Sequence, residues 1–110
     1  MHPRRGEVWW VSFDPSIGGE IQKTRPAVVV SNDSANTALN RVIVVPISSR
    51  VDKVYPGEAL ITLNGEPRKA MADQIMTASK QRLRNKLGIL SGTDVTAVET
   101  AVLLQLAIRR

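Results

Sequence analysis

The run Ala27 to Val30 constrains the fold more strongly than any other stretch of this 110-residue chain. Four consecutive apolar residues have no polar face, which is typical of a short strand covered on both sides. We therefore predict a central strand over Ala27–Ser31. Arg25 and Pro26 directly precede it, and proline limits the residue before it to extended backbone conformations. This junction is either a plain loop end or a rigid mount for a charged group at the rim of a site.

Turn-forming residues divide most of the remaining chain into short segments with strand character. The other expected strands are Gly6–Phe13, Val42–Ile47, Glu58–Leu63, Lys69–Met76 and Lys86–Ser91. Asn64 and Gly65 open a hairpin-type turn over 64–67. Residues 32–40 and 78–83 have room for short helical turns. Pro46, near the end of its strand, indicates a sheet edge or a bulge.

The last part of the chain has the periodicity of a helix. Ser91 and Asp94 have the spacing of a capping box, with aspartate in place of the usual glutamate or glutamine. Apolar residues then recur three and four residues apart, as an amphipathic helix requires, at Val95, Val98, Val102 and Leu106. Five or six short strands followed by one helix predict a small, strongly bent antiparallel sheet that the helix closes on one side. We expect a barrel-like α+β fold in a single domain, residues 1–110.

The second half of this helix, residues 101–108, is apolar nearly all round. A helix on the surface of a small barrel should keep a polar face. We therefore predict that this end packs against a second copy of the chain, giving a homodimer. The alternative is a deeply buried helix in a monomer, and a chain of this size has little core in which to bury it.

The composition excludes several classes of site. The chain has no cysteine, so it has no disulfide, no thiolate zinc site and no cysteine nucleophile, which fits a cytoplasmic protein. No apolar run approaches the length of a membrane span, and no signal-peptide pattern opens the sequence. Aromatic residues make up only 4%, so the core is expected to be aliphatic with Trp9 and Trp10 as exceptions. The net charge of +5 is compatible with a polyanionic partner such as nucleic acid or an acidic protein.

Motifs for several common catalytic mechanisms are absent. The one histidine, His2, lies next to the N-terminus, where a fixed general base is not expected. No paired histidines or carboxylate cluster indicate a metal site, and no nucleophile elbow, phosphate-binding loop or dinucleotide fingerprint occurs. We therefore predict neither a metal ion nor another cofactor.

Polar residues instead collect at the ends of two expected strands, as Glu20, Lys23, Thr24 and Arg25 before the second and Ser48, Ser49 and Arg50 after the third. If these strands are antiparallel neighbours, Arg25 and Ser48 meet at one rim. A guanidinium offers a planar fork of donors that suits phosphate, and a serine hydroxyl beside it can donate to a nonbridging oxygen. The alternative is a structural ion pair between Arg25 and Glu20 or Asp14.

Several longer stretches resemble the MazF/PemK family of toxin endoribonucleases. They are "RRGEVWWVSFDPSIGGEIQKTRPAVVVSND", "VIVVPISSR", "YPGEALITL" and "AMADQIMTASKQRL…KLGILS", which together cover nearly the whole chain. The resemblance implies a small SH3-like antiparallel β-barrel with a C-terminal helix, similar to the gyrase poison CcdB, in a homodimer. It also implies metal-independent cleavage of single-stranded RNA at short sequences, and inhibition by a cognate antitoxin that lies along the RNA groove.

The resemblance also implies roles for individual residues. Arg25 matches the catalytic arginine of the family, Ser48 takes the place of a threonine that supports the reacting phosphate, and Glu20 matches an acidic position in the front loop. Thr24 stands where some relatives have histidine, so a histidine acid or base is not expected. Gln74, within "ADQI", resembles a position that contacts RNA.

RNA carries its own nucleophile, the ribose 2′-hydroxyl, so the enzyme has to align it, remove its proton and stabilise the charged phosphorane. Arginine suits stabilisation better than proton abstraction, which leaves Glu20 as the candidate base. Products with 2′,3′-cyclic phosphate and 5′-hydroxyl ends are implied by the resemblance. Further residues expected to contact RNA are Lys23, Thr24, Asn32, Ser49, Arg50, Lys53, Tyr55 and Arg82.

Three alternatives remain open from the sequence. The residues Asn32, Lys53 and Tyr55 fit ordinary loop chemistry equally well, and Arg82 belongs to a basic stretch that fits a solvated face. The second alternative is a gyrase-binding toxin that uses the same barrel and catalyses no reaction. The third alternative is a non-catalytic barrel that binds RNA or DNA.

Overall fold

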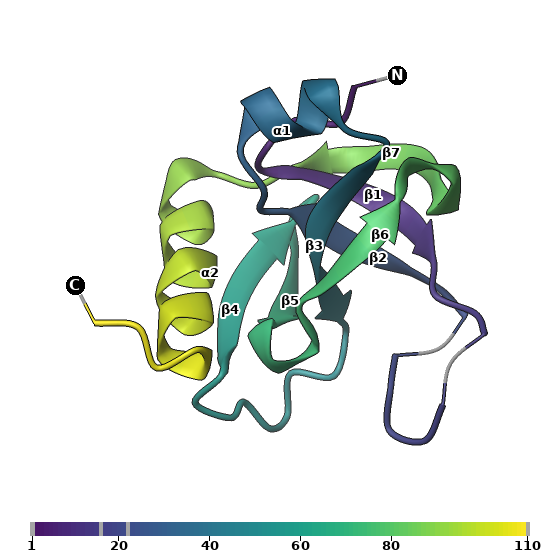
Figure 1. Cartoon of the computed structure of the whole chain (residues 1–110). Helices are drawn as coiled ribbons and strands as arrows, with labels where there is room; N and C mark the ends of the chain where they lie inside the picture. Colours follow the sequence, from purple (N-terminus) through teal and green to yellow (C-terminus); the bar gives the residue numbers. More distant parts are fainter. Residues whose placement is uncertain (1, 16, 22, 110) are drawn as a thin grey trace.

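The computed structural model describes residues 2–15, 17–21 and 23–109 (Figure 1). The strands are β1 (Glu7–Ser12), β2 (Thr24–Val29), β3 (Arg41–Ser48), β4 (Glu58–Leu63), β5 (Glu66–Met71), β6 (Met76–Ser79) and β7 (Leu83–Ile89). The α-helices are α1 (Asp33–Ala38) and α2 (Gly92–Gln105), and single 3-10 turns, Ala72–Gln74 and Lys80–Arg82, stand before and after β6. The helical turns expected in 32–40 and 78–83 are confirmed.

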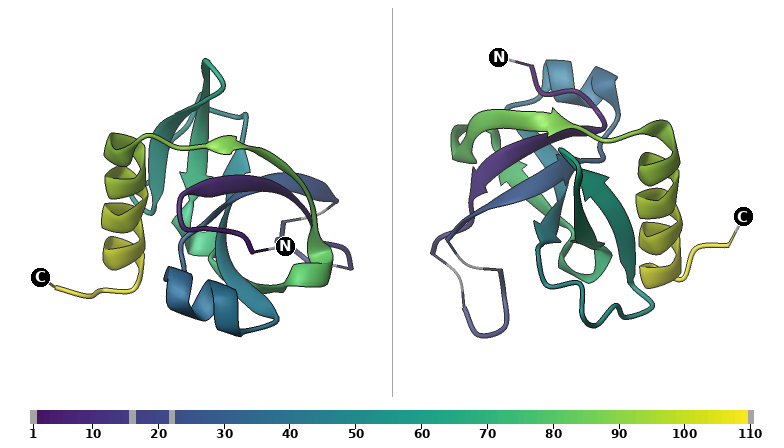
Figure 2. Two further views of the ribbon diagram at one scale, coloured as in Figure 1. Left: turned by 90° about the horizontal axis from the view of Figure 1, so that it is seen from above. Right: turned by 180° about the vertical axis from the view of Figure 1, so that it is seen from behind.

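All the strand pairs are antiparallel, in the order β4-β5-β3-β2-β1-β7, and β6 pairs with a second stretch of β3. Figure 2 shows this sheet curling round on itself, with α2 standing along its outside next to β4. The prediction of an α+β fold, with a strongly bent antiparallel sheet and a C-terminal helix, is confirmed.

The central position of β2 is also confirmed, because its side chains enter two separate cores. Ala27 and Val29 belong to the cluster inside the curl with Trp9 and Val11. Val28 belongs to the cluster between the sheet and α2, with Val98. All of these side chains are at most 8% exposed. The strand is therefore fixed from both faces, which makes it a rigid base for the residues at its start.

The boundaries of β2 differ from the expected Ala27–Ser31. The strand begins at Thr24, because β1 continues to Ser12 and pairs with it there. Arg25 and Pro26 therefore lie inside the sheet and not in a loop before it. Pairing of Arg25 with Val11 fixes its backbone directly.

The expected strand Lys69–Met76 is wrong in its limits. Asn64 and Gly65 alone form the turn, both with positive φ (50° and 82°), so β5 already begins at Glu66. This is the two-residue hairpin geometry that Asn-Gly favours. The 3-10 turn Ala72–Gln74 then ends the strand.

Pro46 does not lie on a sheet edge, which corrects the expectation. It pairs with Ala27 of β2 on one side. On the other side β3 pairs with β6 up to Val44 and with β5 from Ile47. Proline has no N–H to donate, and here it occupies the gap where β3 changes partners.

Helix α2 begins as expected but uses its capping residues differently. Ser91 Oγ accepts a hydrogen bond from the Asp94 N–H at 3.1 Å, which confirms the N-cap. The Asp94 carboxylate accepts from the Thr62 N–H at 2.9 Å and so ties the helix to β4 in place of closing a capping box. Leu106 lies beyond the helix and is 51% exposed. No helix in the described part of the chain is long and apolar enough to cross a membrane.

Candidate active site

Arg25 and Ser48 lie at the same end of two adjacent strands. The β2–β3 ladder pairs Ala27 with Pro46, and the same register extended by two residues sets Arg25 opposite Ser48. Both positions are strand residues, since β2 begins at Thr24 and β3 ends at Ser48. The prediction that these strands are antiparallel neighbours is confirmed. The side chains of Arg25 and Ser48 nevertheless line two different pockets.

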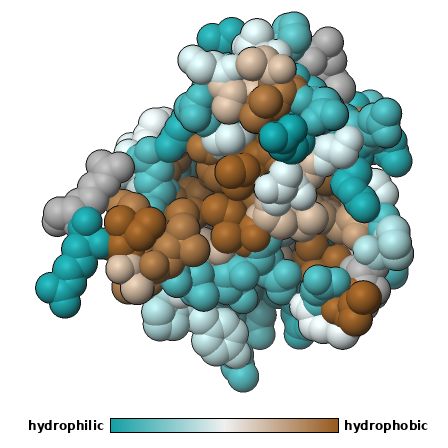
Figure 3. All heavy atoms as spheres, viewed as in Figure 1, coloured by the Kyte–Doolittle hydropathy of each residue, from teal (hydrophilic) through white to brown (hydrophobic). Residues whose placement is uncertain are grey.

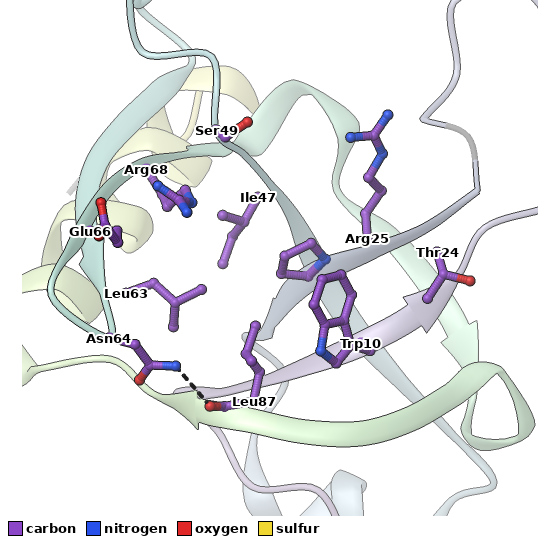
Figure 4. A pocket seen from close by; sticks show the side chains of 11 residues that line it. Trp10, Thr24, Arg25, Ile47, Ser49, Leu63, Asn64, Glu66, Arg68 and Leu87 are labelled. Carbon is purple, nitrogen blue, oxygen red and sulfur yellow. Dashed lines mark hydrogen bonds between the residues drawn. The ribbon is translucent and has the colours of Figure 1, made fainter.

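The exposed side chain of Arg25 borders a pocket of about 390 Å³, called here the Arg25 pocket. Its lining comprises Trp10, Thr24, Arg25, Pro26, Ile47, Ser49, Leu63, Asn64, Glu66, Arg68 and Leu87. Figure 4 shows Arg25 and Ser49 at one end of this pocket, while Asn64 donates to the Leu87 carbonyl at the other, over 3.1 Å. Two guanidinium groups and one carboxylate give the lining a positive balance that suits a phosphate.

Trp10 is a lining residue that the sequence analysis assigned to the core. It pairs with Pro26 across β1 and β2 and is half-buried, whereas Trp9 points the opposite way and is 8% exposed. The sequence could have shown this difference, because side chains alternate between the two faces of a strand. Trp10 shares a face with Ser12, and Trp9 shares the other face with Val11. An aromatic ring beside an arginine is a suitable surface for stacking a nucleic-acid base.

Ser48 lines a neighbouring depression of about 330 Å³, called here the Tyr55 pocket. Its lining comprises Ser48, Arg50, Asp52, Lys53, Tyr55, Lys69 and Met71. Ser48 Oγ accepts a hydrogen bond from the Arg50 N–H at 3.1 Å, which folds the chain back directly after β3. The structure thus gathers four predicted residues here, Ser48, Arg50, Lys53 and Tyr55.

Three other predicted residues, Glu20, Gln74 and Arg82, line a separate depression, called here the Gln74 pocket. Glu20 Oε1 accepts from the Ile17 N–H at 2.7 Å within the segment between β1 and β2. Arg82 donates to the carbonyl oxygens of Ser12 and Asp14, at 3.0 and 2.8 Å. The structure therefore does not put Glu20 in the same pocket as Arg25.

Lys23 and Asn32 line none of these three pockets. Lys23 has φ 66° and its N–H donates to Asp14 Oδ1 at 2.9 Å. Asn32 caps α1 by accepting from the Ala35 N–H at 2.8 Å, beyond the end of β2 that is distant from Arg25. Among the described residues no group of three or more His, Cys, Asp or Glu side chains has the geometry to hold a metal ion.

Comparisons with known proteins identify a family that the chain matches over nearly its whole length. Residues 4–106 match the family model of the PemK-like, MazF-like toxin of type II toxin–antitoxin systems. Endoribonuclease MazF9 of Mycobacterium tuberculosis is 38% identical in an alignment that covers 94% of this chain and 95% of that protein. Probable endoribonuclease MazF1 of the same organism is 49% identical over 59 residues, or 48% of this chain and 63% of that protein.

Solved structures match over the whole fold. MazF from Deinococcus radiodurans superposes with a TM-score of 0.85 at 23% identity, covering 98% of this chain and 99% of that one. An endoribonuclease in complex with its cognate antitoxin, from a mycobacterial species, gives a TM-score of 0.82 at 21% identity, covering 98% of each chain. These likenesses concern the fold.

Proposed function

Because the chain belongs to the family of PemK-like, MazF-like toxins of type II toxin–antitoxin systems, we propose that it is a sequence-specific endoribonuclease that cleaves single-stranded RNA without a metal ion. The observation that carries the proposal is the antiparallel pairing of β2 with β3, which supports the placement of Arg25 and Ser48 at one end of the two strands. Around them lie a pocket with cationic and aromatic lining and a second pocket with an exposed tyrosine.

The reaction needs no nucleophile from the protein. The ribose O2′ loses its proton and attacks the adjacent phosphorus, the bond from phosphorus to O5′ breaks, and O5′ takes up a proton from the solvent. The products carry a 2′,3′-cyclic phosphate and a 5′-hydroxyl. Arg25 donates to the nonbridging oxygens as their charge grows, and the Ser48 hydroxyl donates to one of them. An arginine stays protonated at neutral pH, so Arg25 acts as a donor and not as a base. Glu20 is the proposed acceptor of the 2′-hydroxyl proton. This role requires its carboxylate, which lines the Gln74 pocket here, to come within hydrogen-bonding distance of the ribose next to the phosphate that Arg25 binds.

The two pockets at the ends of β2 and β3 supply the rest of the RNA path. Bases stack on aromatic rings and phosphates bind cations, which is how single strands are commonly held. We assign this work to Trp10 in the Arg25 pocket and to Tyr55 in the Tyr55 pocket. The predicted contacts of Thr24, Ser49, Arg50 and Lys53 with RNA belong to this path, whereas those of Lys23, Asn32, Gln74 and Arg82 stay predictions outside it.

A second copy of the chain and an antitoxin are the proposed protein partners. Figure 3 shows an apolar hollow at the centre of one face. A groove there is lined by Val30, Ile43, Ile75, Val102 and Leu103, and the ion pair of Arg5 with Glu99 also borders it. An exposed apolar groove of this kind supports the homodimer, because it gives a second copy of the chain a surface to cover. One solved structure of the same fold is a complex with its cognate antitoxin, which supports an antitoxin partner. We propose the cytoplasm as the site of action, because a toxin of this family that cleaves RNA would meet its substrate there.

The proposal is tested by incubating the purified protein with a long RNA in EDTA and mapping the new 5′ ends. We expect cuts at one short sequence, with 5′-hydroxyl ends. Cleavage that appears only after a divalent ion is added would contradict the metal-independent mechanism. Intact RNA together with inhibited DNA supercoiling by gyrase would favour the CcdB-like alternative.

A further inference from the structure

A buried ion pair lies beneath the segment that joins β3 to β4. Lys69 Nζ is 3.1 Å from Glu58 Oε1, and the two side chains are only 9% and 8% exposed. Such a pair is weak evidence for stability, because the loss of hydration offsets much of the attraction. The role of this ion pair is indicated by the backbone groups that its two side chains bind.

Those groups are the backbone of the joining segment. Lys69 Nζ donates to the Lys53 carbonyl oxygen at 2.8 Å. Glu58 Oε1 accepts from the Tyr55 N–H at 2.9 Å, and the Glu58 N–H donates to the Tyr55 carbonyl, also at 2.9 Å. Three hydrogen bonds from two strand residues therefore fix the backbone at Lys53 and Tyr55.

The ion pair also faces the ring of Tyr55. Lys69 Nζ lies 5.7 Å from the ring centroid, within the range of a cation–π contact. Tyr55 nevertheless remains 59% exposed. An aromatic ring that is fixed in position and still open to solvent is what a base needs in order to stack.

The position of this ring relative to the proposed reaction centre follows from the sheet. Ser48 pairs with Lys69 across β3 and β5, and both line the Tyr55 pocket together with Arg50 and Lys53. The pocket thus combines an aromatic ring with three cations and one carboxylate, Asp52, directly beside the proposed phosphate ligand Ser48. This is the composition of a site for one nucleotide.

We propose that Lys69 is a positioning residue, which with Glu58 holds Tyr55 as a stacking platform for the base of a nucleotide next to the scissile phosphate. The consequence for RNA binding rests on the proposed function, whereas the ordering of Tyr55 does not. Each part therefore has its own experiment.

The first experiment observes Tyr55 itself. It is the one tyrosine of the chain, so incorporation of 3-fluorotyrosine gives a single ¹⁹F resonance. Lys69→Met should move this resonance toward its position in the unfolded protein and speed amide exchange in residues 53–58 at least ~10-fold, with β2 and β3 still protected. The double variant Lys69→Met/Glu58→Gln serves if the single variant fails to fold, because it leaves no unpaired buried charge. It should shift the resonance and speed the exchange in the same way.

The control Lys86→Met breaks the ion pair of Lys86 with Glu7 on another strand and should leave the resonance in place. A wild-type resonance and wild-type exchange in the double variant would overturn the proposal.

The second experiment measures binding of a 2′-O-methyl oligonucleotide that carries the mapped cleavage sequence and lacks the nucleophile. Tyr55→Ala and Lys69→Met/Glu58→Gln should each weaken binding roughly 10-fold. Combining all three substitutions should weaken it no further than Tyr55→Ala alone, because both changes remove one platform. The positioning role would be overturned if the two losses of affinity multiply in the triple variant. It would also be overturned if Lys69→Met/Glu58→Gln binds with wild-type affinity. If the wild-type protein cleaves no RNA, the proposed function fails while the fluorine experiment still decides the ordering of Tyr55.

Discussion

Gln74 and Ile21, which lie 53 positions apart in the sequence, are joined by a hydrogen bond from the Ile21 N–H to Gln74 Oε1 at 3.3 Å. The other end of the same amide donates from Nε2 to the Gly19 carbonyl at 3.2 Å. Arg82 donates to two further carbonyl oxygens, those of Ser12 and Asp14. Two side chains that were predicted to contact RNA therefore hold the backbone of the segment between β1 and β2.

Gln74→Ala should loosen this segment without weakening the fold. We expect faster amide exchange at Ile21, whose N–H loses its acceptor, and a free energy of unfolding within about 1 kcal/mol of the wild type. Hydrogen-exchange mass spectrometry of residues 17–21 measures the first and urea denaturation the second. Asp73→Ala, at the exposed neighbour, is the control. Unchanged exchange at Ile21 in the Gln74 variant would show that the amide is not a tether.

The adjacent tryptophans should respond in opposite ways to truncation. Trp9→Ala removes a core side chain that is 8% exposed, so it should lower the free energy of unfolding by about 3–5 kcal/mol. Trp10→Ala should leave most of that stability but weaken binding of single-stranded RNA by about 1–3 kcal/mol, through the loss of a stacking surface. Urea denaturation and fluorescence anisotropy separate the two effects. A Trp10 variant with wild-type RNA affinity would remove this residue from the RNA path.

Patterns of apolar residues predicted the fold well because they report burial directly. The run at Ala27 to Val30 required cover on both faces, and β2 has it. The first residue of β2 could not be predicted in this way. The start of the strand is held by pairing with β1 and not by burial of its own side chains. Asn64 and Gly65 indicated a hairpin, but only its backbone geometry shows that β5 begins directly after them.

The site was predictable where it depends on strand order and not where it depends on side-chain direction. The antiparallel pairing of β2 with β3, from which the placement of Arg25 near Ser48 was predicted, is confirmed. Arg82 and Gln74 are polar residues whose partners lie far away in the sequence, so nothing local showed that they bind backbone carbonyls. Nothing in the sequence predicted that Lys69 is buried in an ion pair, because a lysine in a short strand usually faces solvent.

The stability of the protein should fall in acid partly through Glu7. Burial alone would raise the pKa of Glu7, but hydrogen bonds from Lys86, the Arg4 N–H and the Trp9 indole outweigh it and lower the pKa below the ordinary 4.5. The ionised form is therefore favoured by the fold: its contribution is complete above about pH 4.5 and is lost as the pH falls through the lowered folded value. Glu7→Gln should be less stable than the wild type at neutral pH, and this deficit should shrink on acidification. Urea denaturation across about pH 3 to pH 7 measures it, and a deficit that is independent of pH would contradict the prediction.

The proposed homodimer should depend on the apolar groove beside α2. Ile43 lines this groove and is 40% exposed, so Ile43→Asp would place a charge in the interface and should yield a monomer. Ile89, which is 66% exposed and does not line the groove, provides the matched control Ile89→Asp. Sedimentation equilibrium gives the mass of each variant. A wild-type protein that is already monomeric, or an Ile43 variant that stays dimeric, would place the interface elsewhere or remove it.

The most direct test of the account is the rate at which Arg25→Ala cleaves a mapped RNA sequence in EDTA. Arg41→Ala, which removes an exposed arginine at the opposite end of β3, serves as the matched control. Loss of the proposed donor to the phosphorane should slow cleavage at least ~100-fold. Arg25→Ala should keep the urea midpoint of the wild type, and Arg41→Ala should cleave RNA as the wild type does. A folded Arg25 variant that cleaves at the wild-type rate would contradict the assignment of this arginine to the reaction.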